Sequence, residues 1–204
     1  MNLKNFFAAA LIGLAGAGAQ ASTNLVVNGS FEATVQGANS WSTYNSLPGW
    51  TGLPTVELRN NVAGAAYDGK NFVELDSNRN SGIAQTIFAK GLVELSFFYS
   101  ARTGTAAGSN DIGVSFGESF QSVVLDGVAG TSAGNDWKKF TRVIDLGNSG
   151  NAVLAFYALG KSDSYGGSLD NITVTAVPEP ETYALLLAGL GLMGMVARRR
   201  NKAA

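Results

Sequence analysis

The chain of 204 residues contains no cysteine and no histidine, and only 14% of its residues are charged. Without cysteine there are no disulfide bonds, so an exported domain made from this chain has to be held together by burial of its core. Without histidine the usual general base of serine and cysteine hydrolases is missing. Residues 130–134 match the Gly-x-Ser-x-Gly pattern, and we interpret that match as accidental because a glycine-rich loop surrounds it.

Basic residues are sparse between the two ends of the chain. The segment 22–177 has an acidic balance and no stripe of lysine or arginine that would neutralise phosphates. We therefore expect no nucleic-acid partner. An acidic surface of this kind is compatible with a neutral sugar or with a bound cation.

The chain begins with the features of an export signal. Lys4 supplies a positive start, residues 6–18 are apolar, and Ala19-Gln20-Ala21 has the small-x-small pattern of a cleavage site. This order predicts a signal peptide over residues 1–21, with a helical apolar segment and cleavage after Ala21. The following segment, 22–177, has the length of one domain.

The C-terminal segment, 178–204, has three parts in a fixed order. A polar spacer, Pro178-Glu179-Pro180, precedes an apolar run over residues 183–197 and a basic cluster over residues 198–200. At about 1.5 Å per residue the apolar run spans roughly 22 Å as a helix, which is less than a hydrocarbon core of about 30 Å. With Tyr183 at one interface and Arg198 at the other, it predicts a short transmembrane helix whose basic end stays cytoplasmic.

The middle segment is rich in glycine and keeps no apolar period of 3.6 residues. Residues 92–100 and 112–116 alternate apolar and polar side chains, and residues 153–159 are apolar on both faces, as in a central strand. Further strands are expected at 25–27, 56–58, 72–75, 83–88, 122–125, 137–144 and 169–176. Short strands at this spacing, without helices between them, predict an all-β fold, namely a single antiparallel jelly-roll β-sandwich.

Two acids near the ends of this segment are candidate metal ligands. Asp170 has the same parity as Ile172 and Val174, so its carboxylate is expected to point inward, where charge is costly without N–H groups or a cation. Glu32 lies beside a turn near the start. If the first and last strands meet, Glu32 and Asp170 would share a structural Ca²⁺. The alternative is an ordinary hydrogen-bonded aspartate at a turn.

Residues 76–80, Asp-Ser-Asn-Arg-Asn, alternate oxygen-bearing side chains as an EF-hand calcium loop does. The glycine comes one position late, at Gly82, and Ile87 stands where the loop needs glutamate. We interpret the segment as a polar turn between strands.

Aromatic residues near glycine and proline are the candidate sugar-binding groups. Trp50, Tyr67 and Tyr165 would stack on the apolar face of a sugar ring while Arg102 fixes hydroxyl groups. The tryptophans have an alternative role as core residues. A glycosidase pair drawn from Glu57, Glu74 and Glu94 is the enzymatic alternative, but strand faces carry such acids routinely. We expect no catalytic activity.

The C-terminal pattern of Pro178-Glu179-Pro180, an apolar helix and three arginines resembles the PEP-CTERM sorting signal of Gram-negative bacteria. The resemblance implies that an exosortase-type membrane protease recognises Pro178, Glu179 and Pro180 and removes the helix. The protein would then cross the inner membrane, be anchored there transiently, and reach the cell surface or the extracellular matrix.

The middle segment resembles a β-sandwich family with the galactose-binding-like fold, known from plant cell-wall proteins and from bacterial proteins with this sorting tail. The resemblance rests on residues 24–32, 47–50, 68–76 and 169–172. The first and last of these motifs are also similar to those of xylan- and glucan-binding modules, which implies calcium at Glu32 and Asp170. The cysteines and the second module of the plant proteins are missing, so no plant cell-wall ligand is transferred.

These observations lead to two functional hypotheses. The first is an exported, non-catalytic protein that binds a carbohydrate or exopolysaccharide at the cell surface or in the matrix. The second is a structural matrix or adhesion protein that acts through protein contacts or self-association.

Overall fold

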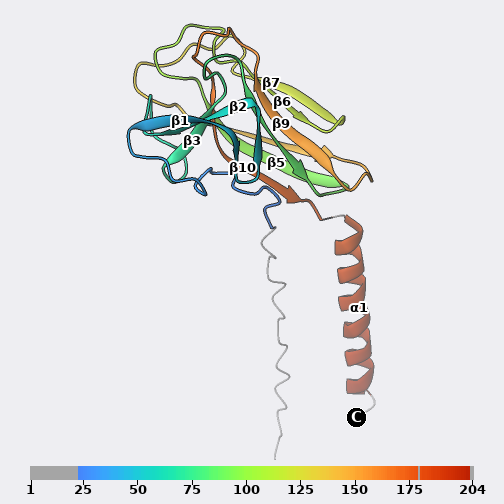
Figure 1. The fold of residues 1–204 in the computed structure, drawn as a ribbon. Coiled ribbons are helices and arrows are strands. Elements are labelled where there is room, and N and C mark those ends of the chain that lie inside the picture. Colours follow the sequence, from blue (N-terminus) through green and yellow to red (C-terminus); the bar gives the residue numbers. More distant parts are fainter. Residues whose placement is uncertain (1–22, 179, 203–204) are drawn as a thin grey trace, which may run out of the picture.

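The computed structural model describes residues 23–178 and 180–202 (Figure 1). The predicted signal peptide and Glu179 of the predicted sorting motif lie outside the described residues. Within them, the chain forms an antiparallel β-sandwich followed by one helix. The all-β prediction is confirmed. The elements are β1 (Ser40–Leu47), β2 (Trp50–Asn60), β3 (Asn71–Glu74), β4 (Gly82–Ile87), β5 (Leu92–Ser100), β6 (Ile112–Phe116), β7 (Phe120–Val124), β8 (Lys138–Asp145), β9 (Ala152–Ala158), β10 (Ser168–Ala176) and α1 (Pro180–Lys202).

Strand β2 joins the two layers of the sandwich. Its first half pairs with β4 through Thr51 and Gly52, whereas residues 57–60 pair with β3. One layer therefore has the order β7-β6-β9-β4-β2 and the other has the order β2-β3-β10-β5-β8, with β1 alongside β2. A strand this long can serve both layers, because each half needs only a few pairing residues.

Aromatic residues fill the core between the layers. The ring of Phe97 from β5 lies 5.0 Å from that of Phe156 from β9, and these strands are not neighbours in the strand order. Phe97 also stacks on Phe140 of β8 at 4.8 Å. The apolar sides of the alternating strands face this core, so the period-2 pattern of β5 and β6 is accounted for by burial of one face.

The sandwich, residues 23–177, is the body of the chain, and its first residues, 24–29, lie along the last strand, β10. Leu25 N donates to Val174 O, Ile172 N donates to Gly29 O, and Asn24 forms an isolated bridge with Thr175. The expected meeting of the first and last segments is thus observed. The strand predicted at 25–27 is not formed, because only the single bridge at Asn24 pairs there.

Helix α1 contains the predicted apolar helix, residues 183–197. Among residues 23–178 and 180–202, no helix is both long and apolar enough to cross a membrane. The transmembrane prediction is therefore not confirmed. The apolar run is shorter than the roughly 20 residues that a spanning helix needs.

Candidate functional site

A group of charged residues lies on the outer face of the layer that contains β2 and β3. Glu57 of β2 pairs with Glu74 of β3, and Glu74 pairs with Ser168 of β10, so these side chains share one face of the sheet. The neighbouring Leu58 and Val73 belong to the core on the other face. Despite their outward direction, Glu57 and Glu74 are only 2% and 0% exposed, because loops cover them.

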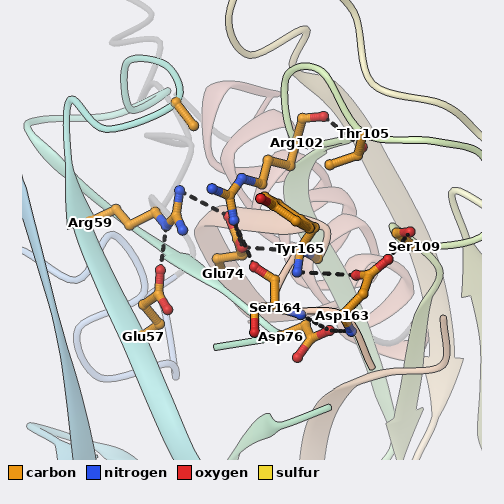
Figure 2. A network of polar contacts seen from close by, with 12 residues as sticks. Glu57, Arg59, Glu74, Asp76, Arg102, Thr105, Ser109, Asp163, Ser164 and Tyr165 are labelled. Atoms are coloured by element: carbon orange, nitrogen blue, oxygen red, sulfur yellow. Dashed lines mark hydrogen bonds and ion pairs between the residues drawn. The ribbon is translucent and has the colours of Figure 1, made fainter. Parts of the chain in front are cut away.

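Two arginines neutralise these two acids (Figure 2). Arg59 Nε donates to Glu57 Oε1 at 2.6 Å, and Arg102 Nη1 donates to Glu74 Oε1 at 2.8 Å. Arg59 Nη1 lies 3.1 Å from Glu74 Oε2, close enough for an ion pair but not aligned as a hydrogen bond. The four residues therefore form one buried chain of alternating charge. A buried network of this kind is sensitive to the loss of any one member.

Burial acts against the charge of Glu74. It raises the pKa of Glu74 to about 7, while the guanidinium groups of Arg59 and Arg102 lower that pKa. Burial raises the pKa of Glu57 as well, against the opposing effect of Arg59. The acids that were considered as a glycosidase pair are thus paired with cations. Glu94 lies apart from them on β5, opposite Val143 of β8.

Arg102 connects the buried ion pairs to an exposed residue, Tyr165. Its Cζ lies 4.3 Å from the centroid of the Tyr165 ring, and its Nη1 also donates to Ser164 O at 2.8 Å. Tyr165 is 47% exposed. The buried carboxylate of Glu74 therefore fixes a guanidinium that in turn supports an exposed aromatic ring.

A cavity of about 310 Å³ opens beside this ring. Ser109 Oγ donates to Asp163 Oδ2 there at 2.8 Å, and Asp163 Oδ1 accepts from Tyr165 N at 3.2 Å. The cavity is lined by Gly104, Thr105, Ala106, Ser109, Asp163 and Tyr165. It combines an aromatic face with hydroxyl and carboxylate groups, which is the chemistry of a site for a polyhydroxylated ligand.

The second predicted aromatic, Tyr67, forms a separate platform. Its ring stacks on Phe98 with 3.4 Å between centroids, and it is 47% exposed. Its loop is connected to the loop of Arg102, since Thr103 Oγ1 donates to Ala63 O at 2.8 Å. The structure thus brings Arg102 and Tyr165 into direct contact, while Tyr67 sits in a hydrogen-bonded neighbouring loop.

Trp50 does not belong to any such surface. It is 2% exposed, its Nε1 donates to Asn28 O at 3.0 Å, and its ring contacts Phe31 and Phe156 of the core. The prediction that Trp50 stacks on a sugar is therefore wrong. The alternative, that it is a core residue, is correct, because its ring packs between Phe31, which precedes β1, and Phe156 of β9 within the core.

The two predicted calcium ligands both bind the loop that precedes β3. Glu32 Oε1 accepts from Lys70 N and Asn71 N, and Asp170 Oδ2 accepts from Tyr67 N and Asp68 N. Burial raises the pKa of Asp170 to about 7, against the hydrogen bonds from the backbone of Asp68, Asn171 and Tyr67. In the described part of the chain no group of three or more acidic, histidine or cysteine side chains is placed to hold a metal ion.

Asn71, whose backbone N–H binds Glu32, has one unpaired oxygen that is suitable as a cation ligand. Asn71 Nδ2 donates to Phe31 O and Thr34 O, which fixes the orientation of the amide, and its buried Oδ1 has no hydrogen-bond partner. Amide oxygens and carboxylates are both usual ligands of Ca²⁺, and a buried amide oxygen without a partner calls for an explanation. Glu32 and Asn71 are thus compatible with the metal, whereas Asp170 is already satisfied by N–H groups.

Asp170 is buried for a different reason from the one expected. The pairing of β10 with β5 shifts between Asp170 and Thr173, and Asn171 has a φ of 47°. This bulge reverses the parity, so that Asp170 shares the outer face with Phe98 while Ile172 and Val174 face the core. The expected inward direction is wrong. The carboxylate is buried by the loop of Tyr67 instead.

The sequence did not single out Arg59, Ser109 or Asp163. The alternation of Glu57, Leu58 and Arg59 would have placed the two charged residues on one strand face. Ser109 and Asp163 lie in loops that are 54 residues apart in sequence, and no pattern connects them.

Comparison with known protein families identifies the C-terminal segment as a sorting motif. Residues 176–200 match the PEP-CTERM protein-sorting motif, which contains Pro178, Glu179 and Pro180. The sorting signal predicted from the sequence is confirmed. No curated protein has a significant match to the chain.

Solved structures show the fold. The chain is similar to a Stig cyclase from Fischerella sp. TAU, with 14% identity, a TM-score of 0.55, and coverage of 77% of this chain and 98% of the cyclase. It is also similar to TmCBM61, solved with β-1,4-galactotriose (15% identity, TM-score 0.49, coverage of 76% and 100%). A family 16 carbohydrate-binding module has 22% identity, a TM-score of 0.46 and coverage of 75% and 100%. The likeness to the cyclase shows that the two chains share the fold of the sandwich.

Proposed function

We propose that the protein is exported, is sorted through its C-terminal motif, and binds a carbohydrate without acting on it chemically. The observation that carries the binding proposal is the exposed Tyr165 ring, held by Arg102 and Glu74 beside a cavity lined with polar groups. Sugar rings offer C–H groups that stack on aromatic faces, and hydroxyl groups that pair with Ser109 and Asp163.

The position of the sorting motif supports removal of the helix after folding. Val177 N donates to Leu92 O at 2.9 Å, and Pro178 follows it as an exposed residue. The sandwich therefore ends just before Pro178-Glu179-Pro180. We propose that an exosortase-type membrane protease recognises these three residues and separates α1 from the body, which then reaches the cell surface or the extracellular matrix.

The calcium proposal concerns stability. We propose that Glu32 and Asn71, with Asp170 holding the same loop, form a structural Ca²⁺ site. The support is the unpartnered Oδ1 of Asn71, a residue whose backbone N donates to Glu32 Oε1 at 2.7 Å. Bound calcium would fix the loop that carries Tyr67.

A second candidate function is adhesion through strand pairing. Strand β8 lies at the edge of its layer and exposes Val143 to 49%. Edge strands of this kind pair with other chains. Self-association of the purified chain, together with no binding to any sugar, would favour this function over carbohydrate binding.

The test of the first proposal is a glycan array probed with the chain and with three variants. We expect Tyr165→Ala to reduce binding by tenfold or more, since stacking on an aromatic residue is lost. Tyr165→Phe should retain binding, because the ring remains. Weaker sugar binding by Tyr67→Ala would show that the Tyr67 ring also contacts the sugar. Equal binding by the chain and by Tyr165→Ala would rule out this site.

A further inference from the structure

The turn of residues 76–80 contains two buried oxygens that nothing in the described structure satisfies. Asp76 is 0% exposed, and its Oδ2 accepts from Asp163 N at 2.9 Å and from Ser164 N at 3.0 Å (Figure 2). Its Oδ1 has no hydrogen-bond partner. Asn80 Oδ1 is likewise buried and without a partner.

The amide of Asn80 is fixed in its orientation. Its Nδ2 donates to Gly160 O at 2.8 Å, and its backbone N donates to Ser162 Oγ at 3.0 Å. Reversing the amide would set its oxygen against the Gly160 carbonyl, which is unfavourable. The oxygen of Asn80 is therefore held as an acceptor on the side away from Gly160.

The two residues are cross-strand partners. Asp76 and Asn80 form an isolated antiparallel bridge, and the ladder hydrogen bond runs from Ser81 N to Leu75 O, one residue outside the pair. In such non-hydrogen-bonded pairs the Cα atoms are about 4.5 Å apart and the side chains project to the same side. The two unsatisfied oxygens thus belong to side chains that project from the same face of the turn.

No cation in the described residues balances Asp76. The ion pairs there join Arg59 and Arg102 to Glu57 and Glu74 only. Burial raises the pKa of Asp76, and the nearby Asp163 carboxylate adds to this effect against the hydrogen bonds from the 163–165 backbone. A buried carboxylate with a free oxygen, whose cross-strand partner also has an unpaired oxygen and which lies near another acid, is an environment that a divalent cation stabilises.

We propose that Asp76 and Asn80 form a second Ca²⁺ site, distinct from Glu32 and Asn71, with backbone carbonyls and water completing the oxygen shell. The site joins the 76–80 turn to the 160–164 loop, through the contacts of Asp76 and Asn80 with both. That loop leads directly into Tyr165. Calcium at this position would therefore fix the backbone on which the Tyr165 ring is carried.

The test is calorimetric titration of CaCl₂ into the purified full chain after treatment with EDTA. We expect Asp76→Asn to bind one calcium ion fewer than the native chain, and Glu32→Gln to lose a different ion. Asn80→Asp should bind calcium at least tenfold more tightly, because it adds a carboxylate to the site. Asp126→Asn, an exposed acid outside the turn, serves as the matched control.

The outcomes separate this site from the first one. An equal number of bound calcium ions in Asp76→Asn and the native chain would overturn the proposal, as would an Asn80→Asp variant that is destabilised and not rescued by CaCl₂. If Asp76→Asn is as stable as the native chain in EDTA and its calcium count is unchanged, the buried side chain of Asp76 needs no cation and the proposal is overturned. If Asp76→Asn fails to fold, the calcium affinity of Asn80→Asp alone tests the proposal: an affinity no higher than that of the native chain would overturn it.

Discussion

Arg102 connects a buried carboxylate to an exposed ring, with Nη1 at 2.8 Å from Glu74 Oε1 and Cζ at 4.3 Å from the centroid of Tyr165. The guanidinium side chain is only 17% exposed. The stability of the buried ion pairs and the position of the exposed ring are therefore linked through this one side chain.

Replacing Arg102 by alanine should lower the free energy of unfolding by about 2 kcal/mol, because Glu74 keeps only one of its two cationic partners. Urea denaturation measures this change. The double variant Arg102→Ala/Glu74→Gln should recover part of the loss, since no buried charge is left unbalanced. Lys139→Ala, which removes a cation outside the network, is the control. Equal stability of Arg102→Ala and the native chain would show that the ion pair contributes nothing.

The pH dependence of stability has a predictable sign. Folding raises the pKa of Glu74 from 4.5 to about 7 and that of Asp170 from 3.8 to about 7. Between these values the folded chain binds more protons than the unfolded chain. The free energy of unfolding should therefore decrease as the pH rises from about 4 to 7 and level off above that, by on the order of 3 kcal/mol for each group.

Urea denaturation in EDTA at pH 4.5 and pH 7.5 measures this change. Glu74→Gln should flatten the profile, whereas Glu118→Gln, an exposed acid, should leave it unchanged. A stability that rises with pH across this window would contradict the assignment.

Calcium should raise the melting temperature of the full chain relative to EDTA. Calcium that binds only the folded chain stabilises it, and the ion would supply the missing partner of Asn71 Oδ1. Glu32→Gln should reduce the difference. Identical melting temperatures with calcium and with EDTA would exclude a structural calcium ion at either site.

Substitution of the sorting motif tests its role. Pro178, Glu179 and Pro180 replaced together by alanine should leave α1 attached to the body, which mass spectrometry of the C-terminus detects. Glu181→Ala, just after the motif, should be processed normally. Normal removal of α1 from the triple variant would show that recognition lies elsewhere.

A glycine in β6 makes room for a tyrosine ring. A Cβ on Gly113 would lie 2.2 Å from Cε2 of Tyr157, so the ring rests directly on the glycine. Gly113→Val should cost about 2 kcal/mol of unfolding free energy. The double variant Gly113→Val/Tyr157→Ala should recover part of this cost. Ser115→Val, on the same face of β6, is the control in the denaturation series.

Strands with strict alternation could be predicted to the residue. Leu92–Ser100 and Ile112–Phe116 coincide with the predicted ranges because each has one face against the core. Strand β1 was missed: apart from Trp41, Tyr44 and Leu47 it consists of Ser, Thr and Asn, and it pairs only with β2. Such an edge strand is held by backbone hydrogen bonds, which do not require an alternating pattern of apolar residues in the sequence.

The site was less predictable than the fold. Tyr165 was found because it stands beside two glycines in a predicted loop, and Arg102 because a loop arginine can bind sugar hydroxyl groups. Their contact depends on a buried partner, Glu74, that comes from a strand far away in sequence. The direction of Asp170 was predicted wrongly because a bulge at Asn171 interrupts the parity rule, and a bulge has no clear signature in one sequence.

The placement of β10 has a consequence for the order in which the sandwich can form. This strand is the last of the sandwich to emerge, yet it pairs with both β3 and β5 in the middle of its layer, and the N-terminal segment of the body lies along it. The layer therefore cannot close until the chain is present as far as residue 176. A chain truncated before that point lacks a central strand of this layer, so the sandwich is complete only when the residue just before the sorting motif is in place.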